Sequence, residues 1–319
     1  MSTLVLGKDQ ATVQSLNDRP NTLTSGHRAC QGCGEALAAR CAIDAAYSAA
    51  GGKIAVVNAT GCLEVFSTSY PDNAWCVPWL HSLFGNAAAV ASGVAAAFRR
   101  KGEDDIRVIA QGGDGGTTDI GMGCLSGMFE RNDDILYICY DNEAYMNTGV
   151  QRSSATPAFS RTATTFPNKE YKGNDPKTGK CVPEIAMAHG IPYVATASVS
   201  NIHDLEAKIA KAINIRGAKY IQIFSPCPLG WGYATSETIK MAQLGVKCGL
   251  YPLFEAENGI FTSSTKIENI IKVEEYLKTQ RRFAHLFGKN PALDEIATIQ
   301  KIADNNIEKY KLNGDFQHE

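Results

Sequence analysis

The sequence Gly-Gly-Asp-Gly-Gly at residues 112–116 lies one residue beyond a short apolar, β-branched run at residues 106–110. Such a run is typical of a buried strand, and the glycines allow the backbone to turn sharply and to approach a ligand closely. A helical pattern at residues 120–130 follows, and then a second apolar run at residues 134–140 that leads into DNEAYMNTG. This order of strand, glycine-rich turn, helix and strand predicts an α/β sheet with a ligand site at the strand ends.

Two side chains with oxygen ligands follow these two predicted strands. Asp114 lies at the carboxyl end of the first strand, and Asn142 lies just beyond the second. Because neighbouring parallel strands bring their carboxyl ends together, we expect both side chains to lie at one site. Carboxylate, amide and carbonyl oxygens suit Mg²⁺, with phosphates completing its shell, and a helix N-terminus favours phosphate. The stretch therefore predicts a site for Mg²⁺ and a diphosphate; the plainer alternative is two turns of an ordinary α/β sheet.

Strand and helix patterns alternate along most of the chain, and this alternation predicts the fold class. Further strand patterns lie at residues 53–58, 191–197 and 219–225, and helical patterns lie at residues 36–50, 87–98, 182–190 and 201–214. We therefore expect an α/β fold with a mostly parallel central sheet and helices on both faces.

The same patterns divide the chain into three parts. Residues 1–25 are polar and predict an N-terminal arm, and residues 26–239 carry the alternating pattern of one domain. Residues 240–319 show a strand with a turn at 251–260 and helical patterns further on, and we expect a C-terminal extension that contacts another subunit. Residues 150–179 lack periodicity, and loops of that length are usually functional or disordered.

Composition narrows the class of protein. The net charge of −2 argues against nucleic acid as the main partner, and no apolar run is long enough to span a bilayer. The N-terminal residues lack the apolar core of a signal peptide, so we expect a cytoplasmic protein. Ten cysteines in a cytosolic chain of this length indicate metal binding, catalysis or buried packing rather than disulfides.

Four of the cysteines share a setting that the others lack. Cys30, Cys33, Cys62 and Cys227 each lie in a loop that contains glycine or proline, and the last two follow predicted strands. Four thiolates gathered at one sheet edge would suit a [4Fe–4S] cluster or a structural zinc ion, and residue chemistry does not choose between them. The alternative is one Cys-x-x-Cys turn with two buried cysteines.

Three segments carry a resemblance to a known family. GHRACQGCGE at residues 26–35, YDNEAYMNTGVQRSSATP at residues 140–157 and PCPLGW at residues 226–231 resemble the β subunits of 2-oxoacid:ferredoxin oxidoreductases, above all those that act on pyruvate. The similarity covers nearly the whole chain. It implies the thiamine diphosphate-binding fold, with thiamine diphosphate, Mg²⁺ and one nearby [4Fe–4S] cluster as cofactors. It also implies that the cluster ligands are Cys30, Cys33, Cys62 and Cys227.

The resemblance further implies which residues bind thiamine diphosphate. Asp114, the side chain of Asn142 and the carbonyl group of Ala144 would hold Mg²⁺. The cofactor-binding residues are expected to be Glu35, Gly61, Cys62, Gly113, Asp114, Gly115, Asn142, Ala144, Tyr145, Met146, Asn147 and Thr148. Asn147 is the best candidate for contacting the reacting group. His81, in a loop with two tryptophans, is a second catalytic candidate, although a single histidine is more often structural.

The implied reaction is the coenzyme A-dependent oxidative decarboxylation of a 2-oxoacid, most of all pyruvate, or the reverse reaction. The resemblance implies that the electrons leave in one-electron steps.

Thiamine enzymes use a glutamate beside the aminopyrimidine ring, and Glu64 is a poor candidate for this role because it lies close to the proposed cluster ligand Cys62. In the resembling family this glutamate belongs to an α subunit that carries the pyrimidine-binding half of the active site. We therefore expect that α subunit, a ferredoxin-like subunit, and ferredoxin or flavodoxin as external acceptor.

Other functions stay open at this point. An oxidoreductase of the same family could act on 2-oxoglutarate or on a branched-chain, aryl or oxalate-type acid. A non-redox thiamine decarboxylase or synthase would bind no cluster. A zinc-stabilised structural subunit would bind zinc and no thiamine diphosphate.

Overall fold

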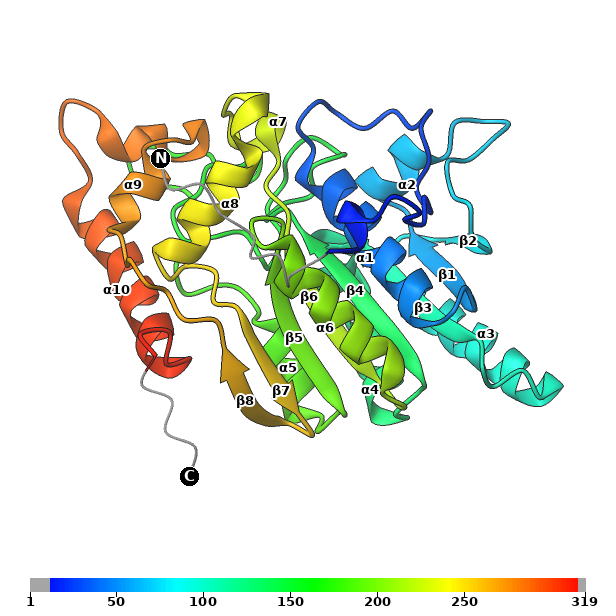
Figure 1. Ribbon diagram of the computed structural model, residues 1–319. Helices are drawn as coiled ribbons and strands as arrows, with labels where there is room; N and C mark the ends of the chain where they lie inside the picture. Colours follow the sequence, from blue (N-terminus) through cyan, green and yellow to red (C-terminus); the bar gives the residue numbers. More distant parts are fainter. Residues whose placement is uncertain (1–11, 315–319) are drawn as a thin grey trace.

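The computed structural model describes residues 12–314, and within this range the strands form one eight-stranded sheet (Figure 1). The strand order is β2-β1-β3-β4-β6-β5-β7-β8. Strands β1 to β6 run parallel, whereas β7 is antiparallel to β5 and β8 is antiparallel to β7. The strands are β1 (Ile54–Ala59), β2 (Trp79–Ser82), β3 (Arg107–Gly113), β4 (Ile135–Asp141), β5 (Tyr193–Ser198), β6 (Lys219–Phe224), β7 (Phe254–Glu257) and β8 (Ile260–Ser264). The predicted α/β fold with a mostly parallel sheet is confirmed.

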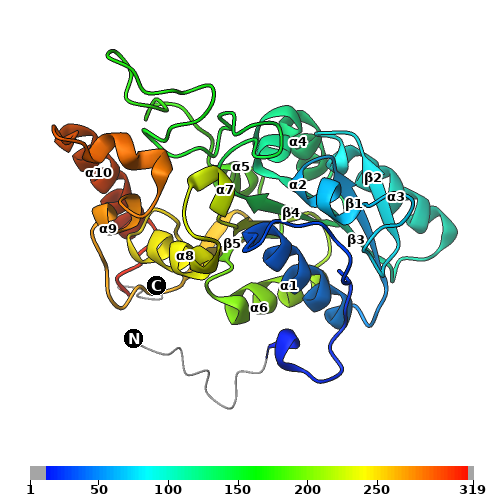
Figure 2. The same cartoon turned by 90° about the horizontal axis from the view of Figure 1, so that it is seen from above.

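Helices cover both faces of the sheet (Figure 2). One face carries α1 (Gly34–Ala49), α6 (Ile202–Asn214) and α8 (Thr238–Lys247), and the other carries α3 (Ala87–Lys101), α4 (Met122–Glu130) and α5 (Val182–Ala188). The remaining helical elements are η1 (Val13–Ser15), α2 (Cys62–Ser67), η2 (Gly115–Ile120), α7 (Pro228–Trp231), η3 (Thr235–Glu237), α9 (Val273–Leu277), η4 (Arg281–Phe287) and α10 (Leu293–Lys309).

The central strand β4 shows why the chain folds into two packed layers. All of its residues are buried, as expected for a parallel strand covered on both faces. Its side chains alternate, so Leu136 and Ile138 join the core beneath α1 and α6. Tyr137 and Cys139 join the core beneath α3 and α4. The continuous apolar run in the sequence therefore serves two cores at once.

Some local elements differ from the sequence patterns. The tryptophan-containing loop before residue 84 contains the short edge strand β2, and the helix expected at 120–130 is preceded by the π-helical turn η2.

The strand and turn expected at 251–260 form a β7–β8 hairpin, whose Asn258 and Gly259 have φ values of 51° and 78°. An Asn-Gly pair between two strands is a strong hairpin signal, so this hairpin was readable from the sequence.

The three predicted parts meet in one structure. Helix α8 crosses the boundary drawn at residue 239, and β7 and β8 extend the same sheet beyond it. At the other end, the backbone N–H of Val13 donates to Glu206 at 2.5 Å, which ties the arm to α6. Residues 1–11 of that arm lie outside the described residues. The expected contact of residues 240–319 with another subunit stays a prediction.

No helix among residues 12–314 is both long enough and apolar enough to cross a membrane.

Candidate active site

The carboxyl ends of four neighbouring strands form the candidate site. In the sheet, β1, β3, β4 and β6 lie side by side. Cys62 follows β1, Asp114 follows β3, Asn142 follows β4 and Cys227 follows β6. Helix α1 begins at the same edge, because the N–H of Gly34 donates to the Pro226 carbonyl group at 3.2 Å. Distant parts of the chain therefore meet where a parallel sheet places its ligands.

A cavity of about 280 Å³, the strand-end cavity, opens at this edge. It is lined by every residue that the sequence assigned to thiamine diphosphate: Glu35, Gly61, Cys62, Gly113, Asp114, Gly115, Asn142, Ala144, Tyr145, Met146, Asn147 and Thr148. Thr60, Phe84 and Gly116 complete the lining, and sequence reasoning missed them. Gly116 belongs to the glycine run and Thr60 precedes Gly61. Their position in the sequence next to predicted site residues could therefore have identified these two as lining residues.

Glycines open the cavity to a ligand. A Cβ atom on Gly61 or on Gly113 would meet no atom within 4 Å, so both residues face free space. At Gly115, by contrast, a Cβ would lie 2.8 Å from the ring of Tyr145. The absence of a side chain at Gly115 thus allows this ring to pack closely against the turn.

Three buried oxygen atoms of residues that line the strand-end cavity have no hydrogen-bond partner: Oε1 of Glu35, Oδ1 of Asp114 and Oδ1 of Asn142. The other oxygen of Asp114 accepts a hydrogen bond from Ser153, and the Nδ2 of Asn142 donates to Glu35 at 3.3 Å. Glu35 therefore orients the amide so that its oxygen remains available. Buried polar atoms without partners are rare in native proteins and call for an ion or a ligand.

The electrostatics of this cavity favour a cation. Burial, followed by the nearby charge of Asp141, raises the pKa of the Asp114 carboxyl well above its usual range. Burial likewise raises the pKa of Glu35 to about 7, against the opposing hydrogen bond from Asn142. A buried carboxylate is costly unless a positive charge compensates it. Carboxylate, amide and carbonyl oxygens together are the donor set that Mg²⁺ prefers, so the residues present fit Mg²⁺ with a diphosphate.

A second cavity of about 260 Å³, the cysteine cavity, adjoins the first. All four predicted cluster cysteines line it: Cys30, Cys33, Cys62 and Cys227. The two cavities share Glu35, Cys62, Asn142 and Asn147 as lining residues. A ligand in one cavity would therefore lie directly beside a ligand in the other.

The thiols in the cysteine cavity are held in a setting that suits metal ligation. Burial, and then the charge of Glu35, raises the pKa of Cys33 to about 12 and raises that of Cys62 further. The sulfur atoms of Cys33 and Cys227 accept backbone N–H groups from Ala36 and Gly230, each at 3.4 Å. Hydrogen bonds to cysteine sulfurs are a feature of iron–sulfur sites, and a bound metal centre would stabilise thiolates that burial alone disfavours.

The side chains are not gathered into a finished metal site. Within residues 12–314, no group of three or more His, Cys, Asp or Glu side chains is arranged so that it could hold a metal ion. The four cysteines thus share a cavity without converging in ligating geometry. The donor chemistry fits a [4Fe–4S] cluster, and the assignment of ligands is a proposal.

The two catalytic candidates lie in different places. Asn147 lines both cavities. His81 lies on β2, where its Nε2 is 2.8 Å from the Thr60 hydroxyl and 3.9 Å from Glu64, and its side chain is 42% exposed. His81 is not a lining residue of either cavity and reaches the strand-end cavity only through Thr60.

The loop after residue 150 contributes contacts that the sequence patterns did not indicate. The Ser153 hydroxyl donates to Asp114, and the Thr156 hydroxyl donates to the backbone carbonyl of Glu143 at 2.7 Å. From the other side, the indole N–H of Trp231 donates to the carbonyl of Asn142 at 2.8 Å. These side chains fix the turn that carries the proposed Mg²⁺ ligands.

Comparisons with known proteins agree with this geometry. Residues 59–223, just over half of the chain, match the family model "Thiamine pyrophosphate enzyme, C-terminal TPP binding domain". Pyruvate synthase subunit PorB of Methanosarcina barkeri is 51% identical over 291 residues, covering 91% of this chain and 97% of that protein. Ketoisovalerate oxidoreductase subunit VorB of Pyrococcus abyssi is 41% identical over 296 residues, covering 90% and 91%.

A solved structure supports the same conclusion. The 2-oxoglutarate:ferredoxin oxidoreductase of Magnetococcus marinus superposes with a TM-score of 0.56 at 25% identity, covering 69% of each chain. The resemblance read from the motifs is thereby confirmed. This chain belongs to the β-subunit family of 2-oxoacid:ferredoxin oxidoreductases, which includes pyruvate synthase subunit PorB, and is a subunit of such an enzyme.

Proposed function

We propose that this chain holds thiamine diphosphate with Mg²⁺ in the strand-end cavity and one [4Fe–4S] cluster in the cysteine cavity. The enzyme would convert pyruvate and coenzyme A to acetyl-CoA and CO₂ with reduction of ferredoxin, or run in reverse. The observation that carries the proposal is the shared wall between the two cavities, one with three unpartnered buried oxygens and one with four cysteines. The 51% identity to a pyruvate synthase subunit favours pyruvate.

The residues of the strand-end cavity would bind and orient the cofactor. Asp114, the Asn142 side chain and the Ala144 carbonyl would hold Mg²⁺, while the glycines let the diphosphate approach the backbone. When bound, thiamine diphosphate supplies the stabilisation of negative charge that decarboxylation requires. Phe84 and Tyr145, whose ring centroids lie 5.9 Å apart, would exclude water from one side. Asn147 would contact the reacting group.

The cysteine cavity would supply the redox function. Its four thiols are the donor set of a [4Fe–4S] cluster, which exchanges single electrons when bound. Because Glu35, Cys62, Asn142 and Asn147 line both cavities, the two cofactors would share one wall. A dehydrogenase that passes electron pairs to another carrier has no need of this arrangement.

We also propose the partners. An α subunit would supply the pyrimidine-binding half with its glutamate, a ferredoxin-like subunit would relay electrons, and ferredoxin or flavodoxin would accept them. The solved 2-oxoglutarate:ferredoxin oxidoreductase has coenzyme A and succinyl-CoA bound, which supports coenzyme A as cosubstrate here. The isolated chain should not oxidise any 2-oxoacid, and turnover by the chain alone would contradict this part of the proposal.

A matched pair of cysteine variants tests the cluster assignment. In the anaerobically purified complex, Cys227→Ser should lower the iron content by up to about four atoms per β subunit. Cys76→Ser, a change at an exposed cysteine outside both cavities, should leave the iron content unchanged. Zinc in the wild-type chain, or equal iron in both variants, would contradict the assignment.

Substrate choice needs its own measurement. The complex should reduce ferredoxin fastest with pyruvate and coenzyme A, and electron paramagnetic resonance should show reduction of the cluster under the same conditions. The branched-chain acid 2-oxoisovalerate is the relevant competitor, because a ketoisovalerate oxidoreductase subunit is 41% identical. Faster turnover with 2-oxoisovalerate or 2-oxoglutarate would assign another member of the family.

A further inference from the structure

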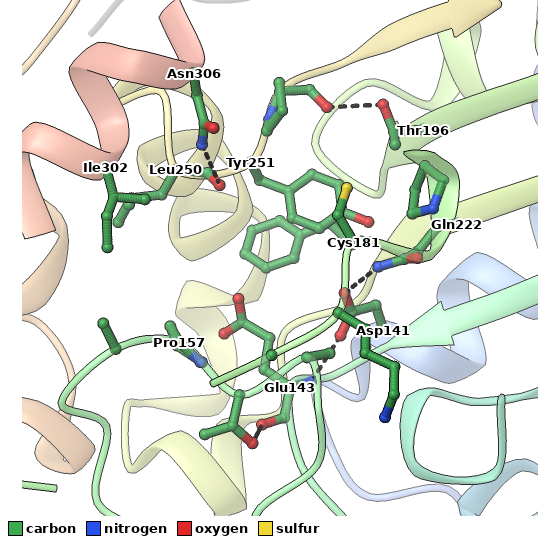
Figure 3. A pocket seen from close by; sticks show the side chains of 18 of the residues that line it. Asp141, Glu143, Pro157, Cys181, Thr196, Gln222, Leu250, Tyr251, Ile302 and Asn306 are labelled. Carbon is green, nitrogen blue, oxygen red and sulfur yellow. Dashed lines mark hydrogen bonds between the residues drawn. The ribbon is translucent and has the colours of Figure 1, made fainter. Parts of the chain in front are cut away.

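Alternate residues of the turn that carries the proposed Mg²⁺ ligands line two different cavities. Asn142 and Ala144 line the strand-end cavity, whereas Asp141 and Glu143 line another cavity of about 340 Å³, the rear cavity (Figure 3). Glu143 has a φ of 67°, which is unusual for a residue other than glycine. Such a conformation persists only where the surroundings hold it.

A buried arginine from the C-terminal part of the chain holds Glu143. The Nη2 of Arg282, in η4, lies 2.6 Å from Oε2 of Glu143, and the two side chains are 4% and 11% exposed. The Glu143 oxygen has no hydrogen bond of good geometry, so the contact is one of charge. Arg282 is itself fixed, because its Nε donates to Gln280 at 2.8 Å and its Nη2 donates to the Tyr276 hydroxyl at 3.1 Å.

The same arginine also supports the neighbouring residue of the turn. Its guanidinium group lies over the ring of Trp231, 3.7 Å from the centroid. The indole N–H of Trp231 in turn donates to the Asn142 carbonyl at 2.8 Å. Arg282 therefore holds two consecutive residues of the turn, Glu143 directly and Asn142 through Trp231.

We propose that Arg282 is a positioning residue for the metal turn: it fixes the backbone at Asn142 and Glu143 so that the Asn142 side chain and the Ala144 carbonyl face Mg²⁺. The inference rests on the proposed function, because it takes these groups as Mg²⁺ ligands. Without the guanidinium group, the buried carboxylate of Glu143 would lose its compensating charge. Lysine would restore the charge but not the planar stacking and forked contacts, so Arg282→Lys should rescue only in part.

The test compares neighbouring arginines in the assembled complex after removal of cofactor. Thiamine diphosphate in MgCl₂ is titrated by calorimetry into the wild type, Arg282→Gln and Arg281→Gln. Arg281→Gln is the matched control, because it removes the same charge from an exposed side chain. Arg282→Gln should bind about tenfold more weakly, as expected for a supporting residue of a metal site. Arg281→Gln should bind like the wild type. With saturating cofactor, kcat of Arg282→Gln should stay within about threefold of the wild type.

A loss of structure alone would lower the number of binding sites and not the affinity of each. If Arg282→Gln does not assemble, Glu143→Gln tests the same contact and should weaken binding similarly. Equal affinity of Arg282→Gln and Arg281→Gln, or of Glu143→Gln and the wild type, would overturn the positioning role while leaving the proposed function intact. A wild-type complex that does not bind thiamine diphosphate with Mg²⁺ would overturn the proposed function itself.

Discussion

Substitution of Gly34 by alanine should strain the joint between the two cysteine-bearing loops. Gly34 begins α1 directly after Cys33, and its N–H donates to the Pro226 carbonyl next to Cys227. A Cβ atom there would lie 2.6 Å from the Pro226 oxygen, 2.9 Å from its nitrogen and 2.9 Å from the Ser225 carbonyl carbon. These are backbone atoms, so α1 and the end of β6 must separate by roughly 0.5–1 Å to reach normal contact distance.

The energetic balance of Gly34→Ala is unfavourable. Overpacking of this kind costs about 1–3 kcal/mol, and alanine recovers at most about 1 kcal/mol of helix propensity. With that gain subtracted, the net loss is up to about 2 kcal/mol, so the complex should melt up to about 4 °C lower at about 2 °C per kcal/mol for a chain of this size. Its iron content should also fall, because the movement carries Cys33 away from Cys227.

Gly123→Ala is the matched control for this prediction. Gly123 lies inside α4, is exposed, and an added Cβ would meet no atom within 4 Å. Helix propensity alone should then raise stability by about 0.5–1 kcal/mol. Scanning fluorimetry and iron analysis of the complex measure both variants. The reasoning is refuted if Gly34→Ala melts as high as Gly123→Ala and keeps its iron.

Two further substitutions address single charges. Asp114→Asn should weaken Mg²⁺-dependent binding of thiamine diphosphate by more than about tenfold. It should also stabilise the cofactor-free protein, because it removes a buried carboxylate. If calorimetry shows unchanged affinity, Asp114 is not an Mg²⁺ ligand. Burial lowers the pKa of Lys219 to about 8 despite its 2.7 Å contact with Asp134. Between pH 8 and pH 10 the unfolded chain therefore binds more protons at Lys219 than the folded chain does, so stability gains up to about 3 kcal/mol with rising pH from this group. Urea unfolding of Lys219→Met should lack that gain, and equal pH profiles of variant and wild type would refute it.

Sequence patterns predicted which side chains meet at the strand ends, because these residues follow a rule of parallel sheets. Asp114 and Asn142 end neighbouring strands, so their meeting follows from strand order alone. Cys62 and Cys227 follow β1 and β6 in the same way. Recognition of these residues needed no knowledge of side-chain contacts.

Contacts between parts distant in the chain were not predictable in this way. Ser153 reaches Asp114 from a loop without periodicity, and Arg282 reaches Glu143 from a segment with an ordinary helical pattern. Strand β2 was missed because it is short and follows Pro78. In each case tertiary packing, and not local propensity, determines the structure.

The proposed redox function depends on segments that flank the thiamine-binding core. The family match covers residues 59–223, whereas Cys30, Cys33 and Cys227 lie outside it. The flanking segments are joined to each other, because the Thr238 hydroxyl donates to the Gly32 carbonyl at 2.6 Å and Gly34 donates to Pro226. Arg282, which also lies outside the core, contacts Glu143 in the turn that carries the proposed Mg²⁺ ligands. In the proposed function, the core would provide the diphosphate site, while the flanks would place the four cysteines beside it and so determine where the electrons go.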